Sequence, residues 1–132
     1  MKEVRVKVFD KQTYPTHSDQ AEHVFDGNLA IKDEDIFITY KDKEVGVNTI
    51  VKASPKDIIV TRMGTMNGKL KFDCNEPFKT LYGTPYGEMP IEIHTSKKEV
   101  YLLEKGIKIY IEYKILIQGE KASDNVFMIV AN

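Results

Sequence analysis

Apolar and polar residues alternate along most of this chain with a period of two. The clearest run lies near the C-terminal end, between residues 107 and 118, and shorter runs cover residues 4–8, 70–74 and 89–94. Because successive side chains of a β-strand point to opposite faces, the pattern predicts strands with one packed face and one solvated face. No long window has the apolar spacing of an amphipathic helix, so a substantial helix is not expected.

Turn-forming residues divide this pattern into short segments of the kind found in sandwiches and barrels. Residues 64–68 give the strongest hairpin signal, because Asn67-Gly68 accepts the positive φ of a tight turn. Residues 96–98 are expected to end another strand, and the polar segment 11–21, which contains Pro15, is expected to form a loop. Short connections between consecutive strands favour an antiparallel meander. Closing the meander into a barrel removes the exposed edges of the sheet. The sequence predicts an all-β fold: a single up-and-down antiparallel β-barrel of roughly eight to eleven strands over residues 1–132.

Composition and charge reduce the number of function classes that the protein is expected to belong to. The chain has 132 residues, 42% of them hydrophobic and 30% charged, and a net charge of −1, which predicts a single globular domain. Its charges are interspersed without a basic stripe, so nucleic acid is not an expected partner. No apolar run is long enough to span a bilayer, and no signal core follows Met1. The single cysteine fits a reducing compartment, and a cytoplasmic protein is expected.

Positions of the same parity as the apolar residues should face the barrel interior. On the clearest strands these are Val4, Val6, Val8, Leu70, Phe72, Cys74, Met89, Ile91, Ile93, Ile107, Ile109, Ile111, Ile115 and Ile117. The same parity includes residues with polar ends, namely Tyr40, Arg62, Tyr82, Thr95 and Tyr113. A buried hydroxyl or guanidinium needs a partner. These groups therefore form a satisfied network, reach solvent at a barrel mouth, or bind a ligand.

Arg62 is the strongest candidate for a ligand-binding residue, because a guanidinium can bind a carboxylate or a phosphate. Its strand is ambiguous, since Ile59 and Met63 are equally apolar on the opposite parity. Cys74 is interpreted as a small core residue, and the three histidines lack metal-ligand spacing. No cofactor fingerprint or catalytic motif is present, so neither a metal nor a cofactor is expected.

The segment Tyr82-Gly83-Thr84-Pro85-Tyr86-Gly87 predicts a rigid, aromatic-lined connection at a barrel rim. Together with Ile38-Thr39-Tyr40, Asn48-Thr49-Ile50 and Arg62-Met63-Gly64, it resembles the YwiB-like family of uncharacterised bacterial proteins. The resemblance extends over nearly the whole chain. It implies a calycin-like barrel, similar to lipocalins and fatty-acid-binding proteins, and supplies no catalytic residues. It draws attention to the family's recurring positions, which are Tyr40, Arg62, Tyr82, Thr84, Tyr86 and Thr95.

Three functions follow as expectations. The first is a binding barrel that holds a small, partly apolar ligand with an acidic group. Its expected ligand-binding residues are Tyr40, Arg62, Tyr82, Thr84, Tyr86, Thr95 and Tyr113. The second is a filled barrel that binds a protein partner, or forms a homodimer, through Tyr110, Leu116 or Phe127. The third and least expected is an enzyme, because no nucleophile–base pair or paired carboxylate stands out.

Overall fold

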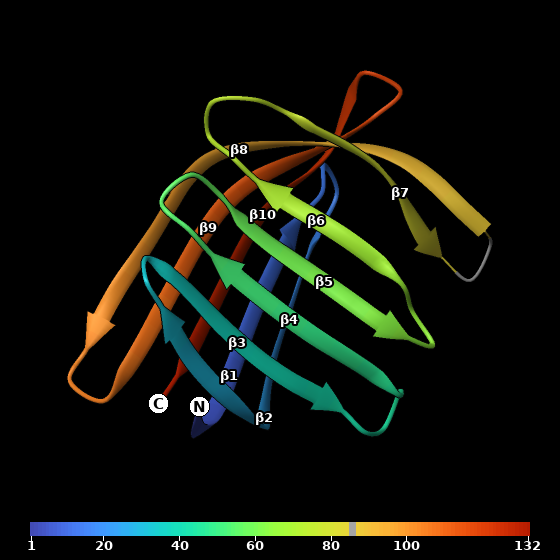
Figure 1. The fold of residues 1–132 in the computed structure, drawn as a ribbon. Helices are drawn as coiled ribbons and strands as arrows, with labels where there is room; N and C mark the ends of the chain where they lie inside the picture. Colours follow the sequence, from blue (N-terminus) through green and yellow to red (C-terminus); the bar gives the residue numbers. More distant parts are fainter. Residues whose placement is uncertain (85–86) are drawn as a thin grey trace.

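The computed structural model describes residues 1–84 and 87–132 of the chain, apart from the side chain of Thr84. Over these residues it contains a single ten-stranded sheet (Figure 1). The strands are β1 (Lys2–Thr13), β2 (Ser18–Lys32), β3 (Asp35–Asp42), β4 (Val47–Ala53), β5 (Ile58–Gly64), β6 (Gly68–Phe72), β7 (Phe78–Thr84), β8 (Gly87–Leu103), β9 (Gly106–Ile117) and β10 (Glu120–Ala131). The described residues include no helix, and hence none that is long and apolar enough to cross a membrane.

The sheet is an antiparallel meander that curls into a nearly closed barrel. Its strand order is β6-β5-β4-β3-β2-β1-β10-β9-β8-β7, so the first and last strands pair in the middle of the sheet. The two edges are β6 and β7, and no ladder joins them in the part of the chain that the structure describes. This arrangement confirms the predicted all-β, up-and-down barrel. It also leaves an open seam in the wall between the edge strands β6 and β7.

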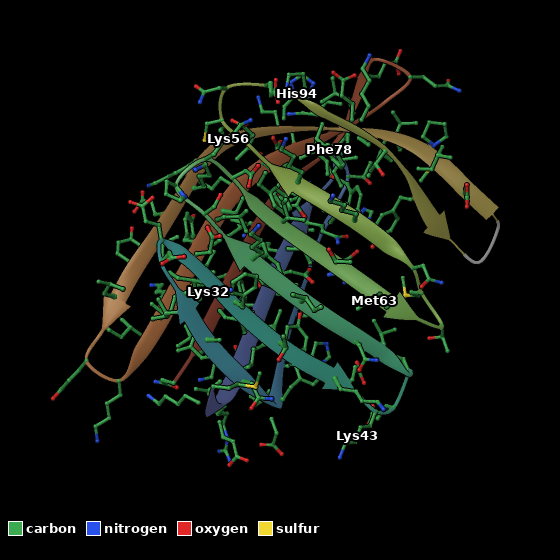
Figure 2. All side chains as sticks on the ribbon, viewed as in Figure 1. Lys32, Lys43, Lys56, Met63, Phe78 and His94 are labelled. Atoms are coloured by element: carbon green, nitrogen blue, oxygen red, sulfur yellow. The ribbon has the colours of Figure 1, made fainter. Side chains whose placement is uncertain are left out.

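The barrel core consists of the inward side chains of nearly every strand. Figure 2 shows side chains on both faces of the curled sheet, with Lys43 and Lys56 at its turns. Ile38, Ile109 and Ile129 are fully buried, and the burial pattern of β9 and β10 alternates as the sequence predicts. Every predicted inward position except Cys74 is buried or packs against this core.

Cys74 corrects the prediction of a core cysteine, because its side chain is exposed. The strand β6 ends at Phe72, so the alternation that places Leu70 and Phe72 inward does not continue to residue 74. The next residue, Asp73, is buried instead and accepts a hydrogen bond from the Asn75 amide through Oδ1 (2.9 Å). This short turn rotates Cys74 towards solvent.

Two predicted breaks in the strand pattern are also wrong. Residues 11–21 do not form a long loop: β1 and β2 pair as far as Thr13 and Ser18. Polar residues are tolerated there because this hairpin projects towards the barrel mouth, where little apolar surface needs cover. Likewise, β8 continues through residues 96–98 with a β-bulge between Thr95 and Lys97, which bends the strand without ending it.

The predicted hairpin at residues 64–68 is present between β5 and β6, but its turn differs from the expected one. The positive φ lies at Gly64 (127°), and neither Asn67 nor Gly68 has one. The side chain of Asn67 closes the turn, since its Nδ2 donates to the Gly64 carbonyl (3.2 Å) and its Oδ1 accepts from the Gly64 amide (3.2 Å). This turn positions the end of β5, where Arg62 lies.

Candidate functional site

The barrel encloses a cavity of ≈ 340 Å³. Most of its wall is apolar and comes from Val60, Leu70, Phe72, Met89, Ile91, Ile115, Ile117, Ala122 and Phe127. Its polar groups come from Asp10, Gln12, Tyr14, Arg62, Tyr82, Tyr113 and Ser123. The volume lies within the range of small-molecule sites, about 300–1,000 Å³, and those sites combine an apolar wall with a few polar groups in the same way. The barrel is therefore not filled by its own side chains.

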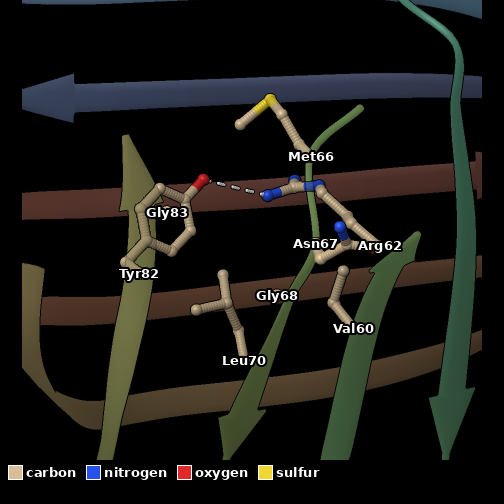
Figure 3. Close-up of a pocket in the computed structure, with 8 residues that line it drawn as sticks. All are labelled: Val60, Arg62, Met66, Asn67, Gly68, Leu70, Tyr82 and Gly83. Atoms are coloured by element: carbon tan, nitrogen blue, oxygen red, sulfur yellow. Dashed lines mark hydrogen bonds between the residues drawn. The ribbon is translucent and has the colours of Figure 1, made fainter. Parts of the chain in front are cut away.

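Arg62 faces this cavity, which settles the ambiguity of its strand. It shares the inward parity of β5 with Ile58 and Val60, whereas Met63 is exposed on the other face. The half-buried guanidinium donates a hydrogen bond from Nη1 to the Tyr82 hydroxyl oxygen (3.2 Å). Figure 3 shows these two side chains pointing towards one another. The bond connects β5 to β7, so a side-chain contact bridges the wall where the β6 and β7 backbones do not pair.

A small recess of ≈ 10 Å³ lies beside this hydrogen bond, at the open edge. Val60, Arg62, Leu70 and Tyr82 line both the recess and the main cavity, and the hairpin residues 66–68 complete the recess (Figure 3). The recess is about the size of one water molecule. Arg62 and Tyr82 therefore lie at the boundary between the cavity and the seam of the barrel.

No carboxylate in the described part of the chain forms a close ion pair with Arg62. Over the described residues, none of the ion pairs within 4.0 Å includes it. A guanidinium presents a fork of five N–H donors, and Tyr82 accepts from only one nitrogen. The remaining donors suit a planar anion such as a carboxylate.

Asp10 is a cavity residue that the sequence prediction missed. It follows Val4, Val6 and Val8 on the inward parity of β1, and this parity was the available signal. The expected strand ends at residue 8 and the expected loop covers residues 11–21, so the predicted inward parity does not extend to Asp10. Burial raises the pKa of the Asp10 carboxyl, and the nearby Arg62 and His23 side chains oppose this shift. The cavity thus contains a partly desolvated carboxyl group, that of Asp10, as well as the cationic guanidinium of Arg62.

The Asp10→Asn variant should therefore change how stability depends on pH. A carboxyl whose pKa is raised on folding favours the folded state below its unfolded value, 3.8, and this benefit is lost as pH rises through the folded pKa. The amide of an asparagine side chain does not titrate and has no such dependence. Relative to the wild type, the variant should gain stability as pH rises from about 3 to about 7, as measured by urea unfolding. A difference in stability that is constant with pH would contradict the proposed environment of Asp10.

Tyr113 lines the same cavity as these two charged residues. Its ring packs against Phe72, with centroids 4.7 Å apart, and its side chain lines the cavity. Burial raises the pKa of its hydroxyl, Asp10 raises it further, and Arg62 lowers it. The phenol therefore stays neutral and can donate a hydrogen bond into the cavity.

Two other predicted site residues lie outside the cavity lining. Tyr40 is buried, stacks on Phe25 with ring centroids 4.9 Å apart, and makes a side-chain hydrogen bond with Thr49. Thr95 is buried, and its hydroxyl has no hydrogen-bond partner. Neither of them lines the cavity. The side chain of Thr84 and the whole of Tyr86 lie outside the described residues.

Metal ligands and surface apolar residues are the remaining candidate groups. No group of three or more His, Cys, Asp or Glu side chains in the described part of the chain is placed to hold a metal ion. Of the expected partner-binding residues, Tyr110 and Leu116 are partly exposed, but Phe127 is buried and lines the cavity. The prediction of Phe127 as a surface residue is therefore wrong, because its parity on β10 is inward.

Comparison with known proteins identifies the relatives of this barrel. Residues 6–129 match a family described as a domain of unknown function (DUF1934). The fold is similar to that in the crystal structure of the ywiB protein from Bacillus subtilis. The TM-score is 0.80 at 20% sequence identity, and the match covers 98% of this chain and 92% of that chain. No curated protein matches the chain.

Proposed function

The chain belongs to the DUF1934 family, a domain of unknown function, and we propose that it is a binding protein for a small, partly apolar acid. The acid group lies on Arg62, and the apolar part occupies the barrel interior. The observation that carries this proposal is a half-buried guanidinium, with no ion-pair partner among the described residues, at one side of a cavity whose wall is mostly apolar.

Both parts of the ligand would contribute favourably to the binding free energy. The apolar part gains about 25 cal/mol for each Å² that it removes from water. The acid gains charge-assisted hydrogen bonds to Arg62, with the hydroxyls of Tyr82 and Tyr113 as further donors. Binding requires no residue with catalytic chemistry, which fits the lack of a nucleophile–base pair among the polar cavity residues.

The Arg62→Gln variant tests the proposal with octanoate as the probe. We expect wild-type protein to bind octanoate in isothermal titration calorimetry, and the variant to bind it about 10–100-fold more weakly, because one charge-assisted contact is lost. Arg5→Gln is the matched control, since Arg5 is the other arginine and is exposed on the outer face of β1. Failure of the wild type to bind octanoate, or equal binding by wild type and Arg62→Gln, would contradict the proposal.

A second candidate function is supported by a separate observation. Four consecutive apolar residues of β8, namely Val100, Tyr101, Leu102 and Leu103, have exposed fractions of 40%, 42%, 79% and 38%. In this half of β8 the ladder is formed with β9 alone, over the described residues. An apolar strip on a strand edge suits a protein partner or a second copy. Light scattering at increasing concentration measures whether the strip mediates self-association.

A further inference from the structure

The cavity is lined by one acidic and one basic side chain, and a simple acid would bind only the basic one. Asp10 lies on β1 and Arg62 on β5, and both side chains line the same cavity. Among the described residues they do not form an ion pair within 4.0 Å, although the positive charge of Arg62 opposes the rise that burial causes in the pKa of Asp10. The three strands β2, β3 and β4 separate β1 from β5 in the sheet, and the curl of the sheet brings both side chains to the same cavity.

The carboxylate of Asp10 also has no other partner. Among the described residues its side chain makes neither a hydrogen bond nor an ion pair. A partly buried carboxylate without a partner is costly, and a ligand group that donates to it recovers that cost. An acid alone would add a second negative charge to the same cavity, which disfavours its binding.

Both charges act on one hydroxyl that lines the cavity. Burial raises the pKa of the Tyr113 hydroxyl, Asp10 raises it further, and Arg62 lowers it. A ligand that satisfies both would therefore have its acidic and basic groups close together, at one end. The rest of the ligand would face the apolar wall, which includes Phe72, Ile91 and Ile115.

Building on the proposed function, we infer that the ligand has a zwitterionic head and an apolar tail, as in an amino acid with a long aliphatic side chain. Its carboxylate binds Arg62, its ammonium group binds Asp10, and its tail lies in the barrel interior. The proposal assigns Asp10 the role of selecting an amino acid over the corresponding simple acid.

Calorimetry with two probes tests this inference, because 2-aminooctanoate differs from octanoate by a single amino group. Wild-type protein should bind 2-aminooctanoate at least tenfold more tightly than octanoate. Asp10→Asn should bind 2-aminooctanoate more weakly and octanoate more tightly, so that the preference disappears. Asp26→Asn is the matched control, because Asp26 is exposed on β2 and does not line the cavity, and it should keep the wild-type preference.

The outcomes separate this inference from the proposed function. If octanoate binds in an Arg62-dependent manner but Asp10→Asn keeps the wild-type preference, the role of Asp10 is overturned and the acid-binding function stands. If octanoate binds in an Arg62-dependent manner but the wild type shows no preference for 2-aminooctanoate, the role of Asp10 is likewise overturned and the acid-binding function stands. If neither probe binds the wild type, both proposals are overturned. Circular dichroism of each variant verifies that the barrel is folded.

Discussion

The Ile109→Ala variant should have a free energy of unfolding about 2–5 kcal/mol lower than that of the wild type, because the substitution leaves a cavity in the packed part of the barrel. Ile109 is fully buried on β9, where it pairs with Ile129 of β10 and Val100 of β8. β9 is paired on both sides at this position, so its backbone has little freedom to collapse into the space. Urea denaturation followed by circular dichroism measures the loss.

Ile31→Ala provides the matched control for this prediction. Ile31 is 60% exposed on β2, so the same truncation should change the unfolding free energy by only about 0.5 kcal/mol. Comparable losses in the two variants would contradict the inward orientation of β9.

The Ala122→Trp variant should lose octanoate binding by at least about a hundredfold, which corresponds to roughly 3 kcal/mol. Ala122 lines the cavity beside the bulge between Lys121 and Ser123. An indole at this position occupies the volume that the ligand's apolar part needs. Arg62 is unchanged in this variant, so the loss would show that the interior itself is required. Calorimetry with octanoate measures it.

Ala30→Trp tests whether a tryptophan alone affects binding. Ala30 follows the buried Leu29 on β2 and therefore lies on the opposite, outer face of the strand. We expect this variant to bind octanoate as the wild type does. Undiminished binding by Ala122→Trp would place the probe outside the barrel and contradict the proposed site.

The fold was predictable because burial repeats with the period of a strand. The alternation from Ile107 to Ile117 requires one packed face, and the turns leave only short connections between strands. The local errors arise where that signal is weak. Cys74 follows a strand end, which side-chain parity alone cannot locate, and the polar end of β1 resembles a loop although it pairs with β2 and β10. Long-range pairing, and not local sequence, stabilises this segment.

The site was predictable only in part, for a related reason. Parity placed Arg62, Tyr82 and Tyr113 inward, and all three line the cavity. The same rule would have found Asp10 if β1 had been extended past residue 10. Parity cannot separate a cavity wall from a solid core, however, because both are inward. Tyr40 is inward but its hydroxyl is bonded to Thr49, and this difference depends on how the strands pair across the sheet.

The most direct measurement for the proposed function is a methyl NMR titration of the isotopically labelled protein with octanoate. Methyl signals of Met89, Ile91, Ile115 and Ile117, which line the cavity, should shift as octanoate is added. The signal of the exposed Ile31 should stay unchanged. Shifts confined to exposed methyl groups, or no shifts at all, would contradict binding inside the barrel.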